Sequence, residues 1–529
     1  MTDQKPPNIL FIMCDQLRWD YLSCAGHPTI NTPNIDRLAA SGVRFDRCYV
    51  QSPVCGPSRA STYTGRTVSS HGVTWNGVPL SVAELTMGDY LRRAGYRVAV
   101  AGKTHLIPDV AGIERVGQSL DTERGRELAA GGFEPYDHDD GLHTAPYFQT
   151  KSEPKYSKWL KSLGYDGDIP WHDYANGSIS ETGETLSAWN LRAARYPARV
   201  PAEHSETPYF VNRAIEFIDG SVDAPWLLHL SFIKPHWPYV APPPYHALYG
   251  QDDVPAPVRA QTEQNNVHPV FKAFQNMRVS TAFSTDEVRD AVIPVYMGLI
   301  HQIDDELGRL FAHLEATGTA ENTVIVFTSD HGDYLGDHWL GEKELFHDCS
   351  ARVPLIVADP RPGSDATRGT VVTELVEAID LLPTFIELAG LPPDEQRLEG
   401  RSLVPFLSGD GPENWRDAAF SELDYAFYAA RLELGIGAND AKIFMLCGER
   451  HKYIHYLGYA PQLYDLEADP NELVDLGQAP EHAAVRTLMQ EQLFDRLARR
   501  RSRVTESDAS VAERTANEAA VGIHIGMWE

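Results

Sequence analysis

Four apolar, β-branched segments in the first two thirds of the chain end in charged or imidazole side chains. They are "NILFIMCDQ" (8–16), "YRVAVAGKTH" (96–105), "WLLHLSFIKPH" (226–236) and "NTVIVFTSDHG" (322–332). Continuous apolar runs of this length are typical of strands buried on both faces, as in a parallel sheet flanked by helices. Each segment therefore predicts one strand of a central sheet whose carboxyl edge carries polar groups.

Segments with helical spacing of apolar residues lie between the predicted strands. They are "TPNIDRLAASG" (32–42), "LTMGDYLRRAG" (85–95) and "YMGLIHQIDDELGRLFAHLEATG" (296–318), each followed or closed by glycine. The alternation predicts an α/β fold with a large central, mostly parallel sheet flanked by helices, extending over residues 1–412.

The pattern changes near residue 413. Short segments such as "AAFSELDYAF" and "KIFMLCGERHKYIHY" predict antiparallel strands, and "AAVRTLMQEQLFDRLARRR" predicts a helix. We expect a smaller α+β domain over residues 413–500. The tail, 501–529, begins polar and ends apolar, so we expect it to fray or to reach a neighbouring subunit in a homo-oligomer.

The segment from 106 to 205 is rich in glycine, proline and aromatic residues and lacks long periodic runs. A loop region of this length is more typical of a substrate-pocket rim or an interface than of a domain. Its Phe148, Trp171 and Tyr174 suggest an aromatic or otherwise flat leaving group, although aromatic loop residues more often serve packing.

Composition and charge narrow the range of partners. The chain has 529 residues with 46 Lys and Arg and 74 Asp and Glu, a net charge of −28. So acidic a protein is a poor partner for nucleic acid or an anionic membrane, but a local basic pocket can still bind a small anion. No segment is long and apolar enough to span a bilayer, and six scattered cysteines fit a reducing compartment, so we expect a cytoplasmic protein.

Two of the strand ends supply groups that suit a metal ion. Asp15 and Gln16 follow the first strand, and Asp330 and His331 follow the fourth. Ligands in open α/β sheets bind beyond the carboxyl ends of the strands, so we expect these four residues to meet there. Two carboxylates, an amide and an imidazole suit one divalent cation, Mn²⁺ or Ca²⁺. Taken alone, "DHG" would indicate only a turn.

Basic residues at the same edge predict an anion site. A tetrahedral oxyanion needs several donors around it, some directed at charge that develops during reaction. We exclude Lys234 because Pro235 should turn it away from His236. The remaining candidates are Arg59, Lys103, His105, His236 and Lys343.

The segment "SPVCGPSRASTYTG" (52–65) places Cys55 at a predicted helix N-terminus, two residues before Pro57 and one turn before Arg59. This environment binds anions and lowers a thiol pKa. Cys55 could be a nucleophile, a metal ligand or a disulfide partner of Cys48. A thiol that attacked a sulfate or phosphate ester would form a stable thioester, with no evident water to hydrolyse it.

Taken together, these motifs resemble the sulfatases of the alkaline phosphatase superfamily. "CGPSR" followed by "TG" resembles their cysteine-type maturation motif, although Thr62 and Tyr63 depart from its usual residues. "GYRVAVAGKTH", "NTVIVFTSDHGDYLGDH" and "LYDLEADPNELVDL" resemble their second signature, metal strand and C-terminal domain. The order and spacing of these motifs match those of the sulfatases from about residue 8 to residue 480. The resemblance implies an arylsulfatase that hydrolyses a small anionic ester.

In sulfatases this cysteine is oxidised by a maturation system to formylglycine, whose aldehyde hydrates to a diol. One hydroxyl would attack sulfur, and the other would later expel sulfate and restore the aldehyde. By this resemblance the residue derived from Cys55 would bind the metal with Asp15, Gln16, Asp330 and His331. Arg59 and Lys103 would hold the diol, His105 would be the base, and His236 and Lys343 would bind the anion and assist departure of the leaving group.

Phosphonate monoester hydrolases are close relatives with the same machinery. "WNGVPL", "PPPYHALYG" and the long insertion resemble them, and by that likeness Asn76 would touch the substrate oxyanion. They carry uncharged hydroxyl residues where this chain has Lys103 and His105, so sulfate monoesters are the first expectation and phosphonate monoesters or phosphodiesters the alternative. An inactive anion-binding homologue and a metallophosphatase that uses the Cys55 thiol are further readings.

Overall fold

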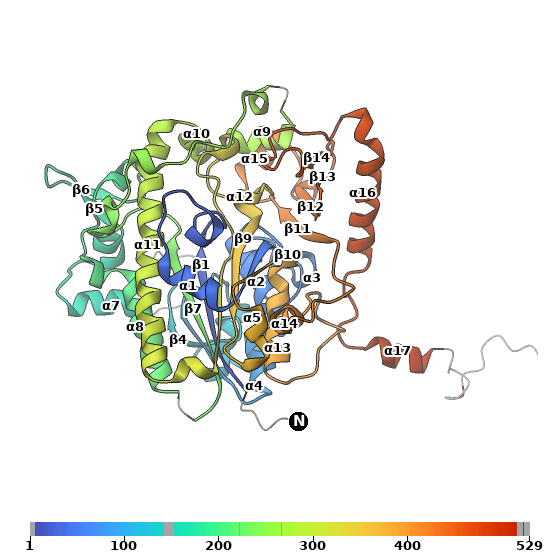
Figure 1. Cartoon of the computed structure of the whole chain (residues 1–529), viewed down its shortest axis with the longest axis horizontal. Coiled ribbons are helices and arrows are strands. Elements are labelled where there is room, and N and C mark those ends of the chain that lie inside the picture. Colours follow the sequence, from blue (N-terminus) through green and yellow to red (C-terminus); the bar gives the residue numbers. More distant parts are fainter. Residues whose placement is uncertain (1–5, 142–152, 222, 266, 516–521, 523–529) are drawn as a thin grey trace, which may run out of the picture.

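The computed structural model describes residues 6–141, 153–221, 223–265, 267–515 and 522, and its centre is an eight-stranded sheet (Figure 1). The strand order is β10-β2-β9-β8-β1-β7-β3-β4. The strands are β1 (Asn8–Asp15), β2 (Val43–Tyr49), β3 (Arg97–Gly102), β4 (Glu134–His138), β7 (Trp226–Pro235), β8 (Thr323–Ser329), β9 (Arg352–Ala358) and β10 (Thr370–Glu377).

The four predicted strands are neighbours in this sheet, in the order β8-β1-β7-β3, and all run parallel. In the described part of the chain, β9 runs antiparallel to both its neighbours, β2 and β8, and the remaining pairs are parallel. The predicted fold class, a mostly parallel central sheet, is confirmed.

Helices cover both faces of the sheet. The described α-helices between residues 6 and 412 are α1 (Pro33–Ser41), α2 (Cys55–Thr64), α3 (Val68–His71), α4 (Met87–Arg92), α5 (Val110–Arg115), α6 (Glu123–Ala129), α7 (Lys155–Ser162), α8 (Glu206–Asp219), α9 (Pro269–Gln275), α10 (Arg278–Phe283), α11 (Asp286–Ala316), α12 (Asp348–Ala351), α13 (Leu381–Leu388) and α14 (Val404–Ser408).

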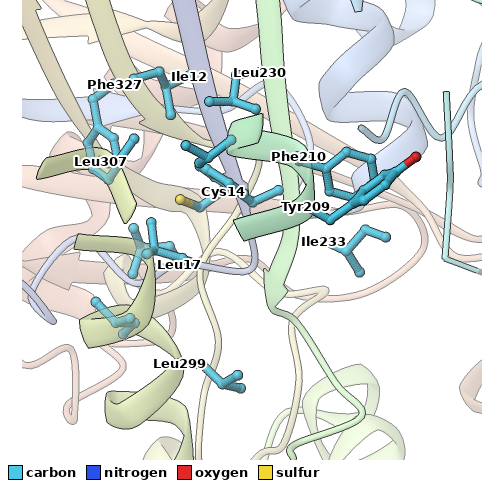
Figure 2. Close-up of a cluster of buried hydrophobic side chains, with 14 of the residues drawn as sticks. Ile12, Cys14, Leu17, Tyr209, Phe210, Leu230, Ile233, Leu299, Leu307 and Phe327 are labelled. Carbon is cyan, nitrogen blue, oxygen red and sulfur yellow. The ribbon is translucent and has the colours of Figure 1, made fainter. Parts of the chain in front are cut away.

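Alternate residues of β1 enter two separate cores, because successive side chains of a strand point to opposite faces. Leu10, Ile12 and Cys14 pack with α1, α8 and α11, whereas Ile9 and Phe11 pack with α2, α4 and α13. Figure 2 shows part of the first core, a single buried cluster that contains Ile12 and Cys14 of β1, Leu230 of β7, Phe327 of β8, Leu299 and Leu307 of α11, and Tyr209 and Phe210 of α8. Burial on both faces explains why the sequence of β1 is continuously apolar.

A second sheet lies on the C-terminal side, as predicted. Its antiparallel strands are β11 (Ala418–Asp424), β12 (Lys442–Gly448), β13 (His451–Tyr456) and β14 (Gln462–Asp465), with α15 (Ala429–Leu434) between the first two. One face packs on α16 (Ala483–Ala498) and the other on the segment 334–351 that follows β8. This sheet therefore supports the segment that contains Lys343.

Two expectations about individual elements were wrong. The helix expected from Tyr296 begins ten residues earlier, at Asp286, and contains Pro294. The segment 106–205 is less irregular than expected, because it contributes α5, α6, α7, the short hairpin β5 (Gly177–Ile179) and β6 (Thr185–Ser187), and the edge strand β4 of the main sheet.

The described part of the tail contains α17 (Asp508–Arg514), in which no residue is buried. In Figure 1 this helix projects from the body of the molecule. The apolar end of the tail falls outside the described residues.

Candidate active site at the carboxyl edge of the sheet

Cys55 is the first residue of α2, and its side chain is buried at the carboxyl edge of the central sheet. Its Sγ lies 3.1 Å from His331 Nε2, 3.4 Å from Lys343 Nζ and 3.7 Å from Asp15 Oδ1. All six cysteines are free thiols, so the alternative of a disulfide between Cys55 and Cys48 is wrong for this structure. The thiol instead faces carboxylate, imidazole and ammonium groups.

Gly56, next to this cysteine, packs tightly against Asn76 and His105. A Cβ atom at residue 56 would lie 3.0 Å from Asn76 Oδ1 and 3.3 Å from the carbonyl oxygen of His105. The Gly56 N–H donates to Asn76 Oδ1 over 2.8 Å, which orients the amide so that its Nδ2 remains as a donor. Asn76 and His105 therefore flank the backbone next to Cys55.

The four residues Asp15, Cys55, Asp330 and His331 form a buried cluster whose potential ligand atoms all lie within 4.8 Å of one another. Asp15 ends β1 and Asp330 follows β8, its parallel neighbour, so the sheet itself brings the two carboxylates together. The structure thus brings these strand ends together, as expected from the sequence.

His331 has the geometry of a metal ligand. Its Nδ1 bonds to the carbonyl oxygen of Gly332 over 2.8 Å, which leaves the Nε2 lone pair directed at the cluster. This Nε2 lies 3.6 Å from Asp330 Oδ1 and 3.7 Å from Asp15 Oδ1. Burial lowers the pKa of His331, which keeps the ring neutral. A lone pair facing two carboxylates is favourable when a cation lies between them, so the donor set fits a divalent ion.

Gln16 completes this set with an amide oxygen. Its φ is 65°, and its N–H donates to Asp330 Oδ1 over 3.1 Å. Its Nε2 donates to Asp333 Oδ2 and, over 3.1 Å, to the hydroxyl of Tyr239. Its Oε1 therefore faces the cluster, 3.3 Å from Lys343 Nζ. Asp333 and Tyr239, which fix the direction of this amide, are not among the site residues expected from the sequence.

Arg59 is fully buried and bonds to the acidic residues of the cluster. Its Nε donates to Asp330 Oδ2 over 2.7 Å and its Nη2 to Asp15 Oδ2 over 3.2 Å. Its Nη1 donates to the carbonyl oxygen of Lys103 and to Ser231 Oγ. Arg59 therefore orients the two carboxylates beside Cys55, and its contact with a diol at residue 55 stays a prediction.

Lys103 and His105 follow β3 on the same edge. Lys103 Nζ lies 2.5 Å from Asp15 Oδ2. Burial raises the pKa of Asp15, but the charges of Lys103 and Arg59 lower it, and the net result is a pKa well below its usual range. Burial and the charge of Lys103 lower the pKa of His105, whose ring is neutral as a result.

His236 and Lys343 form a second pair beside Cys55. Lys343 Nζ donates to His236 Nε2 over 3.1 Å, and His236 Nδ1 donates to the carbonyl oxygen of Trp237 over 2.6 Å. Burial, together with the charges of Lys343 and Lys103, holds the pKa of His236 well below its usual range. In this pair the proton therefore resides on the lysine.

Lys234 lies outside the site, as expected. Its Nζ donates to Asn176 Oδ1 over 3.0 Å and to the carbonyl oxygen of Pro238 over 2.8 Å, and it lies 3.7 Å from Glu206. Lys234 therefore anchors the insertion to the end of β7.

The aromatic residues expected at the rim are placed differently from the prediction. Trp171 is only 1% exposed and donates to Glu206, so it is a packing residue. Tyr174 packs under the guanidinium of Arg199, and Phe148 lies outside the described residues. The exposed aromatic side chain of the described insertion is Trp189, which is not among the residues expected from the sequence.

Comparisons with known proteins find similarity to sulfatases over most of the chain. The family model described as Sulfatase matches residues 7–391, and the model described as N-sulphoglucosamine sulphohydrolase, C-terminal, matches residues 336–499. In the described part of the chain, every helix is too short or too polar to cross a membrane.

Three relatives are informative. The chain is 34% identical to the multifunctional alkaline phosphatase superfamily protein PehA of Trinickia caryophylli, over 93% of this chain and 95% of that protein. It is 28% identical to an arylsulfatase of Clostridium perfringens, over 90% and 91% of the two chains. The crystal structure of a phosphonate monoester hydrolase of Agrobacterium radiobacter is similar with a TM-score of 0.78 and 32% identity, over 93% and 95% of the two chains.

Proposed function

Because the chain belongs to the sulfatase family of the alkaline phosphatase superfamily, we propose that it hydrolyses aryl sulfate monoesters, with the formylglycine form of Cys55 as nucleophile. The observation that carries this proposal is the environment of Cys55. Its Sγ, at a helix N-terminus, lies within 3.7 Å of a carboxylate, an imidazole and an ammonium group. These are the groups that a nucleophile attacking an anionic ester requires.

The proposed cation, Mn²⁺ or Ca²⁺, would be held by Asp15, Gln16, Asp330 and His331 with residue 55 and would stabilise developing negative charge. Formylglycine would supply, as its hydrate, hydroxyl groups at the position of the present Sγ. Arg59 would keep the carboxylates of Asp15 and Asp330 in place.

His105 would accept a proton from residue 55 in the second half of the reaction. Its lowered pKa keeps the imidazole neutral at neutral pH, which a base requires. Its Nδ1 is buried and has no hydrogen-bond partner among the described residues, and its backbone is fixed by Asp140. Lys103 would balance negative charge beside it.

Lys343 and His236 would deliver a proton to the leaving-group oxygen. The proton lies on Lys343, whose Nζ is 3.4 Å from Cys55 Sγ and donates a hydrogen bond to His236 Nε2. Asn76 would donate from Nδ2 to a non-bridging oxygen of the substrate, since its Oδ1 is already held by Gly56.

Phosphonate monoester hydrolysis is a second candidate. The likeness to PehA and to the phosphonate monoester hydrolase structure extends over more than nine tenths of the chain, which favours this activity. Lys103 and His105 favour sulfate, because phosphonate monoester hydrolases carry uncharged hydroxyl residues at these two positions. One site can serve both reactions, because both esters are tetrahedral and carry one negative charge.

The test compares kcat/KM for an aryl sulfate and the matching aryl phosphonate monoester on one preparation with converted Cys55. We expect a preference for sulfate that Lys103→Tyr together with His105→Thr moves toward phosphonate. A preference for phosphonate in the unmodified enzyme would replace the first proposal by the second. Hydrolysis of neither ester would refute both.

The burial of Cys55 bears on when it can be oxidised to formylglycine. Because Cys55 is 1% exposed, we propose that the maturation system oxidises it before the chain has folded.

We also propose that residues 1–412 form the catalytic domain, 413–500 a supporting domain and 501–529 an arm that contacts a second copy. Size measurement by light scattering, with and without residues 501–529, tests this assembly.

A further inference from the structure

Solvent-exposed aromatic rings are rare in this protein. Among the described tryptophan and phenylalanine residues, three are exposed: Trp189 at 44%, Phe427 at 64% and Phe494 at 47%. A single exposed ring is ordinary on a protein surface. A ring that adjoins a reaction site, however, can stack on a bound ligand and gain free energy as it leaves water.

Trp189 is connected to the catalytic groups through two ring contacts. Its ring packs edge to face against Trp237, with centroids 5.4 Å apart, and Trp237 packs against His236, with centroids 4.3 Å apart. His236 bonds to Lys343, whose Nζ lies 3.4 Å from Cys55 Sγ. The two tryptophans therefore continue outward from the proton-delivering pair.

Trp189 also contacts His172 and Trp171 of the insertion. Trp189 Nε1 donates to His172 Nδ1 over 3.4 Å, next to the buried Trp171. Trp171 is bonded to Glu206, and Lys234 links the same region to β7. A rigid ring costs little conformational entropy when it binds a ligand.

We propose that Trp189 and Trp237 form the binding face for the aryl leaving group of the ester. The inference rests on the proposed function, because it takes His236 and Lys343 as the pair that protonates the leaving oxygen. The atoms beyond that oxygen must then extend past His236, where the next side chain is Trp237.

A second aromatic group borders the site elsewhere and provides a comparison. Phe427 stacks on Trp75 with centroids 5.9 Å apart, and Tyr428 meets Trp75 edge to face at 4.4 Å. Trp75 precedes Asn76, which contacts Gly56 and serves the non-bridging side of the substrate in our proposal. This group should therefore contribute little to binding of the leaving group.

The test measures competitive inhibition by 2-naphthol, an aromatic alcohol product, and by inorganic sulfate. Trp189→Ala should weaken inhibition by 2-naphthol about fivefold, the size of an aromatic contact, and leave inhibition by sulfate unchanged. Trp189→Phe should restore most of the loss, because it returns a flat ring. Phe494→Ala, at an exposed ring on α16 that packs against His455, is the matched control and should change neither value.

Three results would overturn the inference. They are absence of inhibition of the wild-type protein by 2-naphthol, equal values for Trp189→Ala and Phe494→Ala, and a loss found in Phe427→Ala instead of Trp189→Ala. Direct binding of 2-naphthol, followed by quenching of tryptophan fluorescence, needs no turnover. It thus separates failure of this inference from failure of the proposed function, which would appear as absence of hydrolysis of both ester classes.

Discussion

Glu422 should make the stability of this protein depend on pH. Its side chain lies on β11, is 5% exposed, and accepts hydrogen bonds from the N–H and the hydroxyl of Ser69 over 2.8 and 3.1 Å. Burial, reinforced by the negative charge of Glu399, raises the pKa of Glu422 from 4.5 to about 7. The folded chain therefore binds this proton more tightly than the unfolded chain does.

Linkage between proton binding and folding gives the direction in which the unfolding free energy changes with pH. The stabilising contribution is fully present below pH 4.5 and is lost as the pH rises through about 7. A shift of about 2.5 pKa units corresponds to about 3 kcal/mol of unfolding free energy, of which about 2.5 kcal/mol is lost between pH 5 and pH 8. Glu422→Gln keeps an acceptor for Ser69 and removes the titration.

The assay compares wild type and Glu422→Gln in urea titrations and thermal scans at pH 5 and pH 8, with Glu449→Gln, an exposed position, as control. The stability of Glu422→Gln relative to wild type should rise by about 2.5 kcal/mol between the two pH values. A relative stability that changes by less than about 0.5 kcal/mol, the usual effect of a surface substitution, would refute the reasoning.

Further predictions concern the candidate active site. Asp330→Asn should lower the affinity for Mn²⁺, measured by calorimetry, at least about tenfold and nearly abolish turnover; unchanged affinity would remove Asp330 from the metal site. Asp333→Asn should lower Mn²⁺ affinity about tenfold, because the Gln16 amide loses its charged acceptor, and an unaltered affinity would mean that the amide needs no such support. His105→Ala should release about one equivalent of alcohol per site and then slow, and steady turnover at the normal rate would contradict its role as base. In His236→Ala the rate should depend more steeply on the pKa of the leaving group across a series of aryl esters, and an unchanged slope would exclude it from proton delivery.

The central strands could be predicted because burial on both faces imposes a simple sequence pattern. β1, β3, β7 and β8 are buried along nearly their whole length and are read as apolar runs. β4 at the sheet edge has the polar sequence "EPYDH" and mostly intermediate burial, so its sequence carries no such pattern. The early start of α11 was missed because Pro294 is typical of a helix boundary, whereas here it lies inside a helix that tertiary packing maintains.

The part of the candidate site that lies at the ends of strands could be predicted from the sequence. Parallel neighbours bring Asp15, Asp330 and Lys103 to one edge, whatever the details of the loops. The supporting contacts could not be predicted, because the hydrogen bond from Gln16 to Asp333 joins residues 317 positions apart. Likewise, the burial of Trp171 and the exposure of Trp189 depend on how the insertion packs against β7, which the aromatic composition does not reveal.

The most direct test of the account is the mass of the tryptic peptide from Cys48 to Arg59, measured together with hydrolysis of an aryl sulfate and an aryl phosphonate monoester on the same preparations. We predict an aldehyde in place of the Cys55 thiol, with activity proportional to the converted fraction and absent from Cys55→Ala. A fully active preparation in which Cys55 remains an intact thiol would contradict the account.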